Sequence, residues 1–186
     1  MAVAVVSQEN VVPLVSRTGR HLQRYNKGLR QVVGCIPYRY KSAEQGSLGD
    51  DEQELEVLVI SSQNGKGMLF PKGGWESDES KTEAALRETL EEAGVRGTIE
   101  HELGSWNFKS KTHDTHYEGY MFPLLVEEQL DIWPEKNIRQ RVWMSVPEAR
   151  KVCYHLWMKE ALDRLVQRLM TAQQLVEGEV APCFIC

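Results

Sequence analysis

Residues 80–94 constrain the fold more than any other stretch, because both ends and both faces of a helix are readable there. The apolar stripe consists of Ala84, Ala85, Leu86 and Leu90. Either Ser77 or Ser80 is placed to cap the start, and Gly94 stands where helices commonly end in glycine. The pattern predicts a helix from Ser80 to Ala93 with an apolar stripe along one side.

Three glutamates share one face of this helix. Glu88, Glu91 and Glu92 are spaced i, i+3 and i+4, so their side chains project together. Such neighbours repel one another by roughly 0.2–0.5 kcal/mol per pair, and a bound divalent cation removes this penalty. Carboxylate oxygens are the ligands that Mg²⁺ and Mn²⁺ prefer. Because most acidic clusters on helices are only solvated faces, the surrounding residues must decide.

The residues before the helix favour a ligand site. Gly73 and Gly74 let the backbone approach a ligand closely and turn sharply. Arg87 follows within the helix and is a suitable ion-pair partner for the carboxylate of Glu79 in the preceding loop. Together with the helix, these residues predict a loop–helix unit that opens at Gly73.

This unit resembles the signature of the Nudix hydrolase family, G-x5-E-x7-R-E-U-x-E-E-x-G-U, where U is a bulky apolar residue. The matching positions are Gly73, Glu79, Arg87, Glu88, Glu91, Glu92, Gly94 and Val95. Thr89 is the one departure, and its β-branched side chain still offers a methyl group for packing. Eight of nine specified positions over one short stretch make the resemblance specific.

The resemblance implies the Nudix fold, an α+β domain built as an α/β/α sandwich around a mixed sheet. It also implies hydrolysis of a phosphate–phosphate bond that depends on Mg²⁺ or Mn²⁺. Glu88 and Glu92 match the family's metal ligands. Glu91 matches a further ligand, or the base that orients or deprotonates the attacking water. By the same resemblance, Lys72, Gly73 and Gly74 contact metal or phosphate, while Glu79 and Arg87 are structural.

The rest of the chain is consistent with one such domain. Strands are predicted over residues 31–40, 55–61, 68–70, 98–103, 104–109, 117–126 and 140–146. Pro147 opens a short helical pattern, and a long amphipathic helix follows from about Leu156 to Leu175. We interpret residues 1–28 as an N-terminal arm, 29–170 as the hydrolase domain and 171–186 as a C-terminal tail.

Beyond the signature, the chain resembles the plant members of the diphosphoinositol polyphosphate phosphohydrolase branch of this family. The segments that carry the resemblance include Arg30–Val33, Glu92–Thr98, Asn137–Trp143 and Trp157–Leu162. Arg30, Arg139, Arg141 and Lys159 fall where that branch places phosphate-binding residues, and Lys109 belongs to a further basic loop. Arg139 and Arg141 are alternate residues that would share one side of a strand.

The resemblance implies that the substrate is the diphosphate group of an inositol pyrophosphate. Dinucleoside polyphosphates, ADP-ribose and NADH remain alternatives within the same chemistry. A protein that binds inositol phosphates without cleaving them is an alternative of another class. That alternative is disfavoured because Glu88, Glu91 and Glu92 are all present.

Composition narrows the partners and the compartment. A net charge of −5 argues against general nucleic-acid binding, and no apolar run reaches the ~18 residues that would cross a bilayer. Four cysteines without metal spacing favour a reducing compartment, so we expect the cytoplasm, with mitochondria or the nucleus as alternatives. The ending Cys183-Phe184-Ile185-Cys186 fits a prenylation signal, but we favour a plain tail. The sequence leaves the oligomeric state open.

Overall fold

The computed structural model describes residues 15–41, 54–63, 65, 67–109 and 115–179. The prenylation-type ending lies outside these residues, as do residues 110–114 of the basic loop. Among the described residues, none of the helices is both long and apolar enough to span a membrane.

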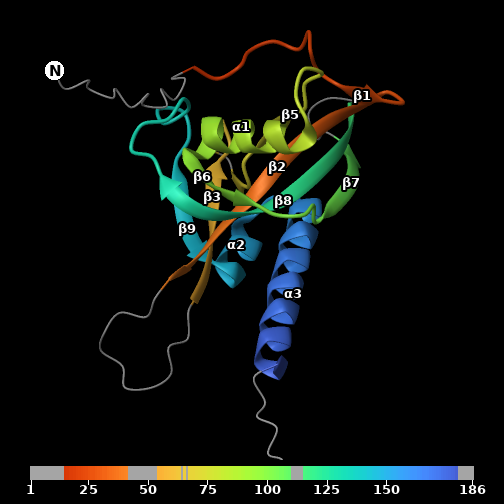
Figure 1. Cartoon of the computed structure of the whole chain (residues 1–186). Helices are drawn as coiled ribbons and strands as arrows, with labels where there is room; N and C mark the ends of the chain where they lie inside the picture. Colours follow the sequence, from red (N-terminus) through yellow and green to blue (C-terminus); the bar gives the residue numbers. More distant parts are fainter. Residues whose placement is uncertain (1–14, 42–53, 64, 66, 110–114, 180–186) are drawn as a thin grey trace, which may run out of the picture.

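A mixed sheet organises the domain around β2 (Leu29–Lys41) (Figure 1). The sheet order is β4-β3-β2-β8-β6, with β1 and β5 also on β2, β7 on β8 and β9 on β3. β2 and β8 run parallel, whereas the other pairs are antiparallel. The remaining strands are β1 (Tyr25–Asn26), β3 (Glu54–Ser61), β4 (Met68–Leu69), β5 (Lys72–Gly74), β6 (Val95–Ile99), β7 (Gly104–Lys109), β8 (His116–Gln129) and β9 (Arg141–Ser145).

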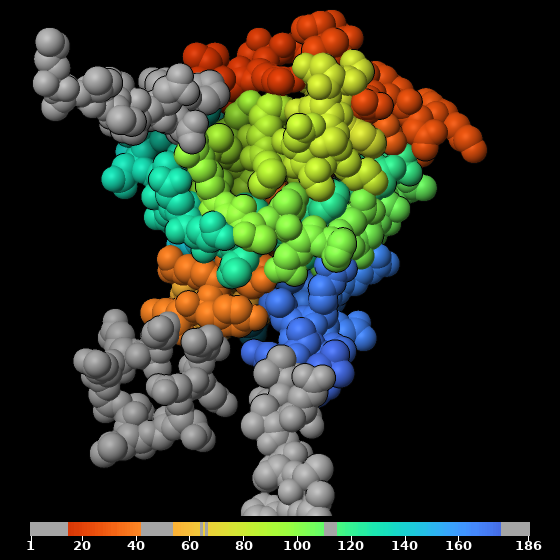
Figure 2. Space-filling view, in the orientation of Figure 1, coloured from red at the N-terminus to blue at the C-terminus, as the bar shows by residue number. Residues whose placement is uncertain are grey.

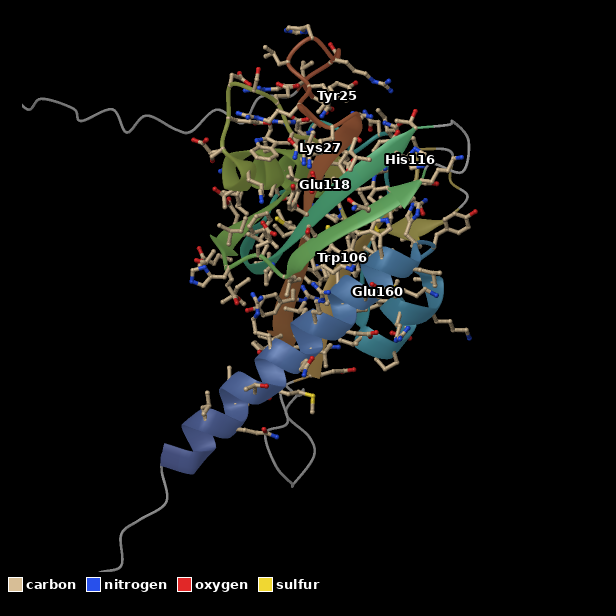
Figure 3. The ribbon with its side chains drawn as sticks, turned by 90° about the vertical axis from the view of Figure 1, so that its right-hand side faces the viewer. Tyr25, Lys27, Trp106, His116, Glu118 and Glu160 are labelled. Atoms are coloured by element: carbon tan, nitrogen blue, oxygen red, sulfur yellow. The ribbon has the colours of Figure 1, made fainter. Side chains whose placement is uncertain are left out.

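Helices cover both faces of this sheet because its central strands are apolar on both sides. Residues 31–38 of β2 and 57–60 of β3 are all buried, which requires a layer on each face. α1 (Lys81–Ala93) lies on one side, and α2 (Val146–Val152) and α3 (Leu156–Glu179) lie on the other (Figure 3). The predicted α+β sandwich with a mixed sheet is therefore confirmed.

Local sequence explains both ends of α1. Ser80 is the N-cap, and its side chain forms a capping box with Glu83. Gly94 ends the helix in the left-handed conformation, with a φ of 63°. Thr89 is fully buried, and its hydroxyl donates to the Ala85 carbonyl at 2.8 Å, which explains how a threonine fits the apolar position of the signature.

The start of α3 is fixed on β7. The indole Nε1 of Trp106 donates to Glu160 at 2.9 Å, and both side chains face each other in Figure 3. Phe108 stacks on Trp157 with ring centroids 4.7 Å apart. These contacts place α3 on the sheet face opposite α1.

Two predictions about strands were wrong. The strand predicted at 98–103 is β6, which begins at Val95, because the left-handed Gly94 turns the chain directly from helix into strand. Arg139 precedes β9 instead of lying within it, so Arg139 and Arg141 do not share a strand face. The predicted boundaries of the arm, domain and tail stay predictions.

Candidate active site

The three glutamates of the signature lie on the face of α1 that meets β5. Glu91 is 7% exposed and Glu92 is 5% exposed, values that are unusual for carboxylates. The backbone N–H of Lys72 donates to Glu92 Oε2 at 2.8 Å. The Glu88 carboxylate packs against Gly73, and Glu91 Oε1 lies 3.6 Å from Arg87 Nη1. The acidic face is therefore buried in the protein and is not a solvated surface.

β5 is the backbone wall of this acidic face, and its glycines are sterically required. A Cβ on Gly73 would overlap the Glu88 carboxylate, and a Cβ on Gly74 would overlap the Gln23 side chain. The Gly74 carbonyl accepts from Arg87 Nη2 at 3.0 Å. Lys72, Gly73 and Gly74 thus all lie beside the acidic face.

Arg87 ties the loop before α1 to the helix. Its Nη2 and Nε donate to the two oxygens of Glu79 at 2.7 and 2.9 Å, which is a bidentate pair. Its Nη1 donates to Glu88 Oε1 at 2.8 Å. Glu79 in turn accepts from the backbone N–H of Glu76 at 3.1 Å. One arginine therefore orients Glu88 while it anchors the loop.

Glu135 is a fourth carboxylate at the site, and the sequence analysis missed it. Its backbone N–H donates to the Glu91 carbonyl at 3.1 Å. Its carboxylate accepts from Arg139 Nε at 2.6 Å, and Arg139 Nη2 binds Glu92 Oε1. Arg139 is 7% exposed and also donates to the Ser61 carbonyl. The only sequence signal for Glu135 was its i, i+4 spacing from Arg139. Ordinary ion pairs in helices have the same spacing, so it did not single out this residue.

Burial and mutual repulsion raise the pKa values of the acidic face. Burial, followed by the charge of Glu88, raises the pKa of Glu91 to about 7. Burial, opposed by Lys72 and Arg139, raises the pKa of Glu92 to about 7. Burial likewise raises the pKa of Glu88, against the neighbouring Arg87. Burial is the largest cause for all three side chains, so the protein interior disfavours their charged forms.

The donor set fits a hard divalent cation. Among the described residues, no three acidic, histidine or cysteine side chains form a ready-made metal cage. Magnesium does not require one, because it usually binds through one or two carboxylates and fills its shell with water and substrate phosphate. Glu88 and Glu92 offer such carboxylates, and a cation beside them would offset the cost of keeping their charges away from water.

The predicted phosphate-binding bases are not all brought together. Arg30 lies beside Gly74: a Cβ built on Gly74 would come 3.1 Å from Arg30 Nη2. Arg30 Nε donates to Gln23 Oε1 at 2.8 Å. Lys109 ends β7 and Lys159 lies in the first turns of α3. Arg141 instead donates to the carbonyls of Ala93, Gly94 and Leu130 and stacks 3.9 Å from the Trp133 ring centre. Arg141 therefore caps the carboxyl end of α1.

The chain is similar to proteins of one known family. The NUDIX domain model matches residues 48–166, which include α1, β5 and Glu135. "Nudix hydrolase 17, mitochondrial" of Arabidopsis thaliana is 63% identical over 161 residues, covering 87% of each chain. "Diphosphoinositol polyphosphate phosphohydrolase 2" of Mus musculus is 34% identical, covering 75% of this chain and 72% of its own.

A solved structure agrees with the assignment at the level of the fold. The Ap4A hydrolase of C. elegans, determined as a binary complex, superposes with a TM-score of 0.58 at 20% identity, covering 76% of this chain and 98% of its own. The chain belongs to the Nudix hydrolase family. It is accordingly an enzyme that acts on phosphoanhydride bonds, in a family whose members generally use Mg²⁺ or Mn²⁺.

Proposed function

We propose that this enzyme removes a phosphate from the diphosphate group of inositol pyrophosphates, in a reaction that depends on Mg²⁺ or Mn²⁺. The observation that carries the hydrolytic part is the buried acidic face of Glu88, Glu91 and Glu92, held against the glycines of β5. The assignment of the substrate rests on the basic residues outside the signature and on the similarity to the mouse diphosphoinositol enzyme.

Each acidic side chain has a distinct role in this proposal. Glu88 and Glu92 hold the cation, since Arg87 and the backbone of Lys72 fix their orientation. When bound, the cation neutralises phosphate charge and makes water a better nucleophile. Glu91 orients a water molecule and accepts its proton as the water oxygen bonds to phosphorus. The phosphoanhydride bond then breaks, and its electron pair leaves with the departing phosphate oxygen.

Bases around the acidic face bind the rest of the substrate. Arg30 beside Gly74 and Lys72 in β5 are the nearest candidates. Lys109 at the end of β7 and Lys159 in the first turns of α3 are further candidates. We assign Arg139 and Arg141 to the protein framework instead of to the phosphates, because both guanidinium groups are engaged with internal carboxylates or carbonyls.

A dinucleoside polyphosphate is the second candidate substrate. It is the substrate class in the name of a structural neighbour, an Ap4A hydrolase that is 20% identical and shares the fold. ADP-ribose and NADH stay further alternatives. A non-catalytic inositol-phosphate sensor is a weaker proposal, since the acidic face is complete.

Side-by-side hydrolysis tests the proposal. Purified protein with Mg²⁺ is incubated with an inositol pyrophosphate, diadenosine tetraphosphate, ADP-ribose and NADH, and the products are quantified with and without EDTA. We expect the highest kcat/KM for the inositol pyrophosphate and no turnover in EDTA. A preference for diadenosine tetraphosphate would replace the substrate assignment, and binding without turnover of any substrate would support the sensor.

The compartment also remains a proposal. The Arabidopsis relative is named as a mitochondrial Nudix hydrolase, which favours the mitochondrial alternative over the cytoplasm. Imaging of the full chain fused at its C-terminus to a fluorescent protein distinguishes the two.

A further inference from the structure

The turn at residues 135–139 docks on the last turn of α1. The Glu135 carbonyl accepts from the N–H groups of Ile138 and Arg139, each at 2.9 Å, so the chain closes a single turn there. The Glu135 N–H donates to the Glu91 carbonyl at 3.1 Å. Figure 1 shows the loop between β8 and β9 beside the carboxyl end of α1, and in Figure 2 its turquoise surface borders the green surface of that helix. The backbone of this turn is therefore fixed to the helix that carries the acidic face.

One guanidinium links the turn to the acidic face. Arg139 Nε donates to Glu135 Oε2 at 2.6 Å, and Arg139 Nη2 donates to Glu92 Oε1. Arg139 Nη1 donates to the carbonyl of Ser61 in β3 at 2.9 Å. Each nitrogen of the guanidinium thus has a partner from a different segment, which fixes its plane. Glu135 and Glu92 share the positive charge of Arg139.

These three charged side chains are largely shielded from water. The exposed fraction of the side chain is 7% for Arg139, 7% for Glu92 and 13% for Glu135. Charges interact more strongly where water is excluded. Two carboxylates against one guanidinium leave an excess of negative charge. Without Glu135, the same guanidinium would balance Glu92 alone, and the attraction of Glu92 for a cation would fall.

Glu92 keeps acceptor capacity for a cation in this arrangement. Its Oε2 accepts from the Lys72 N–H at 2.8 Å, and its Oε1 accepts from Arg139. A carboxylate oxygen has two lone pairs, so each of these oxygens can take a further partner. A cation beside Glu92 is repelled by the charge of Arg139, because like charges repel. The carboxylate of Glu135 on the same guanidinium offsets that repulsion.

We propose that Glu135 is a positioning residue of this enzyme: its carboxylate holds Arg139 at Nε and balances its charge, which leaves Glu92 able to bind the divalent cation. The inference rests on the proposed role of Glu92 as a metal ligand. Glu135 acts through Arg139 and contacts neither the cation nor the attacking water.

Mn²⁺ binding to variants of the full chain tests this role. Glu135→Gln removes the charge and keeps an oxygen that can accept from Arg139, whereas Glu135→Asp keeps the charge. Glu128→Gln is the matched control, because it neutralises an acid that lies 3.6 Å from Arg96 in an exposed pair. The Mn²⁺ dissociation constant, measured by electron paramagnetic resonance without substrate, should rise about 10- to 100-fold in Glu135→Gln. Glu135→Asp should recover most of the affinity, and Glu128→Gln should match the wild type.

Turnover at saturating Mn²⁺ separates positioning from direct catalysis. With the metal site filled, kcat of Glu135→Gln should fall far less than the roughly 10²–10⁴-fold expected on removal of a general base. A loss of that size with unchanged Mn²⁺ affinity would make Glu135 a base and overturn the inference. An unchanged Mn²⁺ dissociation constant in Glu135→Gln would overturn it as well.

Two comparisons separate action through Arg139 from direct metal binding. A ligand shortened by one methylene is drawn away from its metal, so equal losses of Mn²⁺ affinity in Glu135→Asp and Glu135→Gln would make Glu135 a ligand and contradict the inference. In an Arg139→Gln background, Glu135→Gln should change the Mn²⁺ dissociation constant less than in the wild type, because the charge that Glu135 balances is gone. An effect of equal size would count against action through Arg139. Should Arg139→Gln fold poorly by circular dichroism, the result for Glu135→Asp alone decides.

Failure of the proposed function gives a different result. A wild type that binds no Mn²⁺, or a Glu92→Gln variant that binds it normally, would contradict the metal site itself. Normal binding by the wild type, loss in Glu92→Gln and no loss in Glu135→Gln would contradict only the role of Glu135.

Discussion

The guanidinium of Arg139 binds the carboxylate of Glu92 directly, although the two residues are 47 positions apart. Both side chains are 7% exposed, and Arg139 also holds Glu135. This contact joins the loop before β9 to the last turn of α1. It is the contact behind our proposal that Arg139 serves the protein framework and not the phosphates.

Replacement of Arg139 is expected to lower the free energy of unfolding. Arg139→Ala leaves Glu92 and Glu135 without their partner, and breaking a buried pair costs about 3–5 kcal/mol. Urea unfolding of Arg139→Ala, Glu92→Gln and the double variant should show coupling above about 1 kcal/mol. Arg150→Ala is the control, because the exposed pair of Arg150 with Asp163 should contribute less than about 1 kcal/mol. Equal losses in the two arginine variants would contradict this role.

Gly73→Ala is expected to damage the metal site selectively. The added Cβ would overlap the Glu88 carboxylate, which must then turn away from β5. Mn²⁺ affinity should fall at least about tenfold, as it does when the orientation of a metal ligand is lost. Gly67→Ala is the matched control, since its Cβ would meet Tyr154 at an ordinary 3.6 Å. Undiminished Mn²⁺ affinity in Gly73→Ala would show that Glu88 is not a ligand.

The metal-free protein should lose stability as pH rises from about 4.5 to 7. Burial holds the pKa values of Glu91 and Glu92 at about 7, above the ordinary value near 4.3. In that window the folded state binds more protons than the unfolded state, so rising pH favours unfolding. Melting temperatures in EDTA should follow this trend, and Glu92→Gln should flatten it. If the melting temperatures of the wild type and of Glu92→Gln changed equally with pH, the raised pKa of Glu92 would be refuted.

The thiol of Cys35 should be unreactive in the native protein. Burial raises its pKa to about 12, and burial also raises the pKa of Cys153. In a variant carrying Cys183→Ser and Cys186→Ser, Ellman's reagent at pH 8 should label neither thiol until urea is added. Rapid labelling without urea would mean that the β2–α1 interface opens readily.

Local patterns predicted the helix and the acidic face, because both depend on residues within a few positions of one another. Ser80, Gly94 and the spacing of Glu88, Glu91 and Glu92 are such features. The longer sheet strands followed from apolar runs, although the left-handed Gly94 brings the start of β6 forward to Val95. The short strands β1 and β5 carry no apolar run and were not predicted.

Contacts between distant segments were not predictable in this way. Glu135 lies in a loop without a pattern of its own, and Ser16 reaches it from 119 positions away. Arg141 was predicted to bind phosphate, and in the structure the carbonyls at the end of α1 accept its hydrogen bonds. Only the three-dimensional fold shows which partner each base has.

Substitution within α1 tests the central claim, that its buried acidic face holds a divalent cation for phosphoanhydride hydrolysis. Mn²⁺ affinity and phosphate release are measured for Glu88→Gln, Glu91→Gln, Glu92→Gln and the exposed control Glu83→Gln. Glu88→Gln and Glu92→Gln should lose both Mn²⁺ affinity and phosphate release. Glu91→Gln should lose roughly 10²–10⁴-fold in turnover, as expected for a general base, and Glu83→Gln should retain both. Wild-type turnover with Glu88 and Glu92 both replaced would contradict the account.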